Sequence, residues 1–142
     1  MLQGPVEAQS LAVDGLSDGT PLVAVRRRDG SFLFRWNGSA WTETSIDRSA
    51  TRAFGLAMAV TSTNKILVYG PAPLATQMNE WASRDRGATW VKTVLYATGS
   101  TIKRWPNASV FADLGGKERV IVTWIENDNG VPNNLGVIDR PQ

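Results

Sequence analysis

The 142-residue sequence contains neither cysteine nor histidine. Without cysteine, the chain can form no disulfide and no thiolate metal site. Without histidine, it cannot perform Ser-His or Cys-His catalysis by itself, and a zinc site would need carboxylates alone. No apolar run approaches the roughly 18 residues of a membrane-spanning helix. We therefore expect no resident cofactor and no membrane partner.

A strong charge of either sign is also missing. Lys and Arg number 15 and Asp and Glu 13, so the net charge is only +2. The single basic cluster, Arg26 to Arg28, lacks the interleaved aromatics of a single-strand binder, and no nucleic-acid partner is expected. The first five residues lack the pattern of a signal peptide, which leaves the compartment open. The hydrophobic share of 42% suffices for one domain with a real core.

Short apolar or alternating runs recur along the chain, separated by Gly, Pro, Asn and Asp. Such runs are typical of β-strands bounded by turns. No stretch of 11 or more residues keeps a helical period with start and stop signals. The pattern predicts an all-β chain, with strands near 10–13, 21–27, 31–36, 41–46, 54–60, 65–70, 78–83, 89–96, 108–113, 119–125 and 135–138.

These strands fall into repeats. Segments 34–41 and 83–90 share a glycine and a closing tryptophan at a spacing of 49 residues, and apolar runs upstream of each repeat as well. Periods of roughly 40–50 residues with four strands are typical of β-propeller blades. The sequence therefore predicts antiparallel four-stranded blades, about three in a single domain, near 7–47, 51–97 and 104–140.

Residues 83–90 match the pattern Ser-x-Asp-x-Gly-x-Thr-Trp at every fixed position, through Ser83, Asp85, Gly87, Thr89 and Trp90. Asp85 can accept hydrogen bonds from the backbone of the turn that it begins. Gly87 can supply a positive φ, and Trp90 offers a large apolar ring to the core. The chemistry of the segment is structural.

This segment resembles the Asp-box, or BNR, repeat of sialidases and other carbohydrate-active propellers. The resemblance implies that the box lies in the hairpin between the third and fourth strands of a blade, on the face opposite the active site. It thus implies a structural role for Asp85, and it favours a glycan partner and an extracellular or periplasmic protein. Trp36 and Trp41 look like a degenerate counterpart in the first blade.

In propellers of this kind, ligands meet the loops between blades and between the second and third strands. The richest such segment is 103–107, which holds Arg104, Trp105 and Asn107, and Arg52 stands at the matching position one blade earlier. Arginine can bind a carboxylate through two parallel hydrogen bonds, so two arginines facing one axis would suit an acidic sugar. The simpler alternative is solvated loop charges, with Trp105 packing before a strand.

Catalytic and metal candidates are weaker. The resemblance implies a Tyr nucleophile with a Glu base, for which Tyr69 and Glu126 are the topological candidates. The family's three arginines and its acid Asp cannot be mapped onto this sequence. The acidic loop 126–130 fails the EF-hand pattern, and an irregular calcium loop is the remaining metal alternative.

About three blades would leave two open sheet faces, which favour association. We expect either a piece of a larger chain or a homo-oligomer in which two copies complete a six-bladed ring. The first functional hypothesis is a carbohydrate-recognition or scaffold module without catalysis in this chain alone. The alternatives are half of a glycan-degrading enzyme, a sialidase-like glycosidase or a polysaccharide lyase, and a protein-interaction propeller.

Overall fold

The computed structural model describes residues 8–49, 55–97, 102–128 and 131–142, which contain strands and turns but no helix. None of these residues therefore belongs to a helix that could cross a membrane. The strands are β1 (Ser10–Gly15), β2 (Pro21–Arg27), β3 (Gly30–Trp36), β4 (Trp41–Asp47), β5 (Ala57–Val60), β6 (Ile66–Pro71), β7 (Gln77–Ser83), β8 (Val91–Ala97), β9 (Ile102–Ala112), β10 (Glu118–Asp128) and β11 (Val131–Pro141).

The strands form three antiparallel sheets. We call β1–β4 sheet 1, β5–β8 sheet 2 and β9–β11 sheet 3. Within each sheet every strand is hydrogen-bonded to its neighbour in sequence, as short connections favour. The predicted all-β fold of propeller-type blades is confirmed as a partial propeller of three such sheets.

The three sheets share one building plan. In each, a backbone hydrogen bond closes the first hairpin, at 2.9 Å from Leu16 to Thr20, 3.0 Å from Thr61 to Lys65 and 2.9 Å from Asp113 to Lys117. One residue before the closing position, each turn takes a positive φ, at Gly19, Asn64 and Gly116. Glycine and asparagine tolerate this backbone region best. The repeat in the sequence is therefore a structural repeat.

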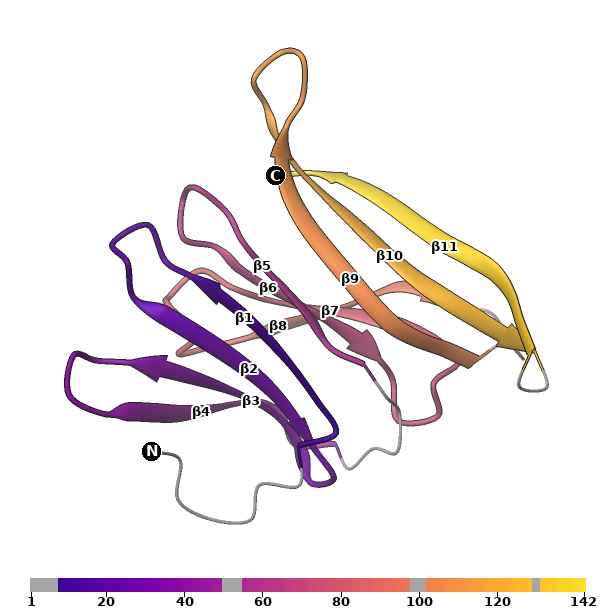
Figure 1. Cartoon of the computed structure of the whole chain (residues 1–142), viewed down its shortest axis with the longest axis horizontal. Coiled ribbons are helices and arrows are strands. Elements are labelled where there is room, and N and C mark those ends of the chain that lie inside the picture. The colour runs from indigo at the N-terminus through magenta and orange to yellow at the C-terminus, as the bar shows by residue number, and fades with distance from the viewer. Residues whose placement is uncertain (1–7, 50–54, 98–101, 129–130) are drawn as a thin grey trace.

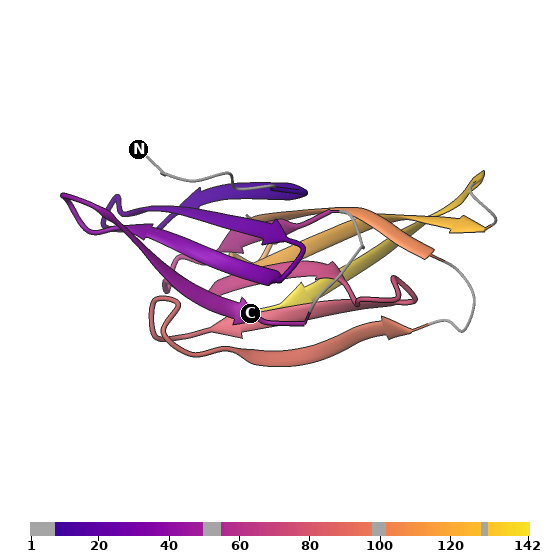
Figure 2. The same cartoon turned by 90° about the horizontal axis from the view of Figure 1, so that it is seen from below.

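Sheet 2 lies between sheets 1 and 3 (Figure 1). Because side chains alternate across a strand, sheet 2 presents two apolar faces. One face packs Ile66, Val68 and Trp81 against sheet 1, and the other packs Leu67, Tyr69 and Met78 against sheet 3. Strand β5 lies against both β1 and β9, and Figure 2 shows these first strands towards one side of the molecule with β8 towards the other.

The two end faces, in contrast, present apolar side chains to solvent. On sheet 1, Leu11 and Val13 pair across the ladder with Val25 and Val23, on the face away from sheet 2, and are 60% and 67% exposed. On sheet 3, Ile121, Leu135 and Val137 are also exposed. We call these surfaces the outer faces of sheets 1 and 3.

Two predicted loops are wrong, because the strands of sheet 3 are longer than the sequence indicated. Residues 103–107 belong to β9, and residues 126–128 of the predicted acidic loop belong to β10. The prediction took Pro106 and Asn107 for turn residues. The ladder accommodates them at a β-bulge, where its register shifts opposite Thr123 and Ile125 and Pro106 needs no ladder N–H.

Candidate functional site

The sheets have two edges. We call the side where β2, β6 and β10 end the upper edge, which is drawn towards the bottom of Figure 1. The side of the first hairpin turns, drawn towards the top of Figure 1, is the lower edge. The hairpin of residues 83–90 lies at the lower edge, because it follows β7 on the same side as the turn between β5 and β6. The predicted ligand residues of β9 lie near the start of that strand, beside the end of β10, and therefore at the upper edge.

The hairpin of residues 83–90 is held by its own side chains. Asp85 accepts hydrogen bonds from the backbone N–H of Thr89, at 2.9 Å, and from the hydroxyl groups of Thr89 and Ser83. The Ser83 hydroxyl in turn accepts the N–H of Gly87 at 2.8 Å. Hydrogen bonds from Thr89 and then Ser83 lower the pKa of Asp85 to about 2. The side chains of Ser83, Asp85 and Thr89 therefore connect the two ends of this hairpin.

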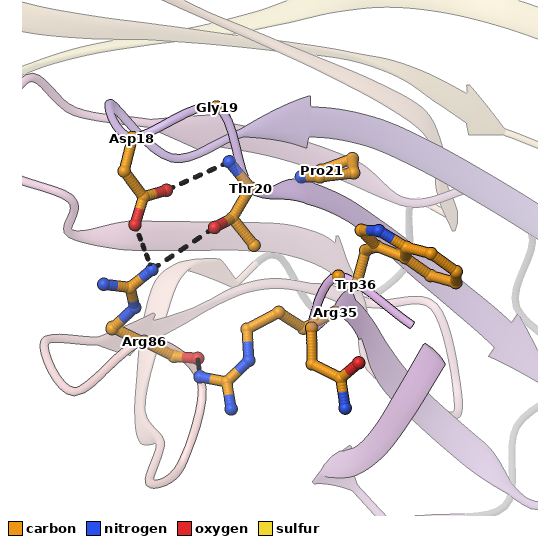
Figure 3. Close-up of a pocket in the computed structure, with 9 residues that line it drawn as sticks. Asp18, Gly19, Thr20, Pro21, Arg35, Trp36 and Arg86 are labelled. Atoms are coloured by element: carbon orange, nitrogen blue, oxygen red, sulfur yellow. Dashed lines mark hydrogen bonds and ion pairs between the residues drawn. The ribbon is translucent and has the colours of Figure 1, made fainter. Parts of the chain in front are cut away.

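The same hairpin also ties sheet 2 to sheet 1 (Figure 3). Arg86 forms an ion pair with Asp18, and its carbonyl accepts a hydrogen bond from Arg35 Nη1 at 3.2 Å. Gly87 has a φ of 90°, and a Cβ there would lie 2.3 Å from the Leu33 side chain. Glycine is thus required both by the turn and by the close approach of the sheets. Trp90 packs against the core between the two sheets.

At the upper edge, Trp105 occupies the bulge of β9 with a φ of 47°, which is uncommon for a non-glycine residue. Its side chain is 51% exposed, and the Arg104 guanidinium lies 5.9 Å from the centre of its ring. The backbone of Trp105 packs on Gly55, where a Cβ would come within 2.7 Å of its nitrogen. An aromatic ring and a guanidinium are therefore presented together to solvent.

The other two predicted ligand residues are Asn107 and Arg52. Asn107 is exposed on β9, paired across the ladder with Thr123. Arg52 lies outside the residues that the structure describes. The role of these residues in ligand binding stays a prediction.

Beneath this edge lies Arg26, which in the sequence stands out only as part of a basic cluster. It is 3% exposed and donates hydrogen bonds to the carbonyls of Pro71, at 3.1 Å, and Gly55, at 3.4 Å. Burial lowers the pKa of Arg26 to about 10, against the opposing effect of Asp47, so it stays charged at neutral pH. Arg26 thereby supports the glycine on which Trp105 rests. The signal in the sequence was its place on the inward face of an otherwise apolar strand.

The catalytic candidates Tyr69 and Glu126 are both buried between sheets 2 and 3. Burial and the neighbouring Glu80 carboxylate raise the pKa of the Tyr69 hydroxyl. Glu126 accepts a hydrogen bond from Trp124 Nε1 at 3.1 Å and pairs with the buried Lys103 at 3.7 Å. Burial lowers the pKa of Lys103, against the effect of Glu126. A catalytic role for either residue stays a prediction.

No group of three metal-ligating side chains occurs among the described residues. Residues 129 and 130 of the acidic loop lie outside them, so the calcium alternative stays a prediction.

No protein-family model and no curated protein matches the chain. Among solved structures, it is similar to a fucose lectin from Kordia zhangzhouensis in complex with methyl-fucoside, with a TM-score of 0.55, 14% identity and coverage of 91% of this chain and 97% of that one. It is also similar to the alpha-L-arabinanase of Penicillium chrysogenum complexed with arabinobiose, with a TM-score of 0.62, 14% identity and coverage of 91% and 44%.

AofleA from Arthrobotrys oligospora matches with a TM-score of 0.56 and 12% identity over 94% of this chain and 44% of that one. The chain thus spans nearly the whole of the fucose lectin but less than half of the arabinanase and of AofleA. At these identities the similarity shows a shared fold.

We predict that Asp85→Ala lowers the melting temperature at neutral pH. In the folded chain the pKa of this carboxylate lies below its usual value of 3.8. The carboxylate therefore stabilises the fold fully above about pH 3.8, and this contribution is lost as the pH falls towards about 2. The difference between Asp85→Ala and the wild type should therefore shrink between these pH values in thermal melts followed by circular dichroism.

The matched control is Asp29→Ala, which removes only an exposed ion pair with Arg27 and should change the melting temperature little. Equal melting of Asp85→Ala and wild type at pH 7 would contradict the structural role of Asp85.

Proposed function

We propose that the chain is a glycan-binding module that performs no catalysis alone, and that Trp105 and Arg104 form its sugar contact. The observation that carries this proposal is the exposed indole of Trp105, held in an uncommon backbone conformation beside a guanidinium. An indole can cover the apolar face of a sugar ring, and an arginine can bind hydroxyl or carboxylate oxygens.

Backbone strain supports the proposal. A left-handed conformation costs a non-glycine residue about 1–2 kcal/mol, and such residues concentrate at binding and catalytic sites. The β-bulge at Trp105 also supports the proposal, because bulges are frequent next to functional sites, where they change the direction of a side chain. The similarity to a fucose lectin over 97% of that chain adds support for a glycan ligand. With Arg104 and the predicted Arg52, an acidic glycan is the favoured class.

Trp105→Ala should weaken glycan binding by at least about thirtyfold, because truncating a tryptophan at a binding hot spot costs about 2 kcal/mol or more. The ligand is first selected on a glycan array that includes fucosides and acidic glycans, and affinity is then measured by isothermal titration calorimetry.

Leu74→Ala is the matched control, because Leu74 is also a large exposed apolar residue of the upper edge, in the turn between β6 and β7. It should bind as the wild type does. Unchanged affinity in Trp105→Ala would refute this site, and an array without any bound glycan would favour the protein-interaction alternative.

A second candidate function is half of a glycan-degrading enzyme, and the similarity to the arabinanase, of which this chain spans 44%, favours it. The catalytic candidates would be Tyr69 and Glu126, completed by another chain or by further sequence. This alternative predicts turnover of chromogenic glycosides that Tyr69→Phe abolishes while glycan binding persists. If the assembled wild type binds glycans without turning them over, the enzyme alternative is contradicted and the non-catalytic function is supported.

We also propose that a second copy of the chain covers the two outer faces. Because the three sheets share one building plan, corresponding faces can be compared between them. The outer face of sheet 3 corresponds to the face that sheet 1 buries against sheet 2 and to the face that sheet 2 buries against sheet 3. The outer face of sheet 1 is likewise the counterpart of the faces that sheets 2 and 3 bury against the preceding sheet. Two copies related by a two-fold axis could therefore pair both faces at once, as the interior does.

Light scattering should accordingly find a dimer, and Val137→Asp should convert it to a monomer. The new carboxylate would lie at the centre of an apolar contact and lose its hydration there. Val91→Asp is the matched control, because Val91 is 69% exposed on β8 and away from both outer faces. A monodisperse wild-type monomer at high concentration would contradict pairing between copies and favour a longer chain.

A further inference from the structure

We propose that a pocket at the lower edge, between sheets 1 and 2, binds the carboxylate group of an acidic sugar. The pocket measures about 530 Å³, within the range of small-molecule sites. Three segments far apart in sequence form it: the turn of residues 18–21, the hairpin of residues 35–38 and Arg86. It lies at the opposite edge from Trp105, so the inference is independent of the function proposed above.

The polar side chains of the pocket hold one another in place (Figure 3). Asp18 accepts the backbone N–H of Thr20 at 3.0 Å and pairs with Arg86, which also donates to the Thr20 hydroxyl at 3.4 Å. The backbone carbonyl of Arg86 accepts a hydrogen bond from the guanidinium of Arg35. A ligand would find these groups already oriented, which lowers the entropic cost of binding.

The charges of the pocket do not cancel. Hydrogen bonds from Thr20 and Arg86 hold the pKa of Asp18 far below its usual value, so its carboxylate is ionised at neutral pH and neutralises Arg86. Arg35 has no carboxylate partner among the described residues, and only its Nη1 is used, by the Arg86 carbonyl. One guanidinium charge therefore remains for a ligand.

The position of Arg35 suits a ligand between the two walls. Figure 3 shows Arg86 and Asp18 on one side of the pocket, Trp36 and Pro21 on the other, and Arg35 between them. A guanidinium binds a carboxylate through two parallel hydrogen bonds. The ionised Asp18 nearby repels a doubly charged group such as phosphate more strongly than a singly charged carboxylate, because the repulsion grows with the charge of the ligand.

The remaining lining suits the hydroxyl groups and ring of a sugar. The carboxylate of Asp18 can accept hydrogen bonds from ligand hydroxyls, and the Thr20 hydroxyl can donate or accept them. Asn37 uses its Oδ1 to cap the N–H groups of Ser39 and Ala40, at 3.0 and 2.8 Å, so its amide N–H groups remain donors at the rim. Gly19 and Gly38 leave open space, since a Cβ at either would meet no atom within 4 Å.

The test compares two ligands that differ only in the carboxylate, methyl glucuronoside and methyl glucoside, titrated into the full chain by calorimetry. We expect the glucuronoside to bind more tightly than the glucoside by about tenfold or more, as charge-assisted hydrogen bonds provide. In a chain that also carries Trp105→Ala, which removes the upper site, Arg35→Ala should abolish this preference. Arg35→Lys should keep only part of it, because lysine retains the charge without the bidentate geometry.

Arg84→Ala is the matched control, because Arg84 is an exposed arginine of the hairpin that supplies Arg86 but does not line the pocket. It should retain the preference, and so should Trp105→Ala, which separates this site from the upper one. Equal affinity for both glycosides, or equal loss in Arg84→Ala and Arg35→Ala, would overturn the proposal.

Backbone NMR shifts of the wild type give a second measurement that needs no variant. On adding methyl glucuronoside, the amides of Gly19, Thr20 and Gly38 should shift, whether or not that of Trp105 shifts as well. Shifts at Trp105 without shifts at Gly19 and Gly38 would assign the binding to the upper edge and overturn the lower site.

Discussion

The packing of sheet 2 between sheets 1 and 3 is the constraint on which the rest of the structure depends. Its two faces are made by adjacent residues of the same strand, with Ile66 and Val68 towards sheet 1 and Leu67 and Tyr69 towards sheet 3. A shift of one residue in the register of β6 would exchange the two faces. The lower pocket requires that sheets 1 and 2 pack in this arrangement, and the support of Trp105 requires that sheets 2 and 3 do so.

Buried polar groups add specificity to this apolar packing. Arg26 reaches from sheet 1 to the backbone of sheet 2, and the pair of Lys103 and Glu126 lies between sheets 2 and 3. Desolvation of such charges offsets much of their attraction, so their contribution to the free energy of folding is small or unfavourable unless their partners are in place. Asn79 is fully buried, and neither polar atom of its side chain has a hydrogen-bond partner in the described part of the chain. Arg26, Lys103 and Glu126 favour one alignment of the sheets over others, because any other alignment would leave them without these partners.

Much of the fold could be predicted from local patterns. Alternation and turn dipeptides predicted all eleven strands, and the pattern of residues 83–90 predicted a hairpin held by Asp85. The prediction failed at residues 103–107, where Pro106 and Asn107 suggested a turn and the partner strand β10 drew them into a bulged ladder. The lower pocket could not be predicted, because Asp18, Arg35 and Arg86 have no common spacing and meet only through the contact of two sheets. Arg26 was missed for the same reason, since its partners at Gly55 and Pro71 lie far along the chain.

The sequence by itself determined the strands, the turns between them and the repeat, because these depend on alternation and on backbone preferences within a few residues. It also determined the absence of histidine and cysteine chemistry. The tertiary structure alone decided which charged side chains are buried, that the Trp105 ring is exposed, and that three separate segments border a pocket beside Arg35. The physical reason is that sheet-to-sheet packing joins residues that are distant in sequence, and the burial of a charge or the shape of a cavity depends on all of its neighbours at once.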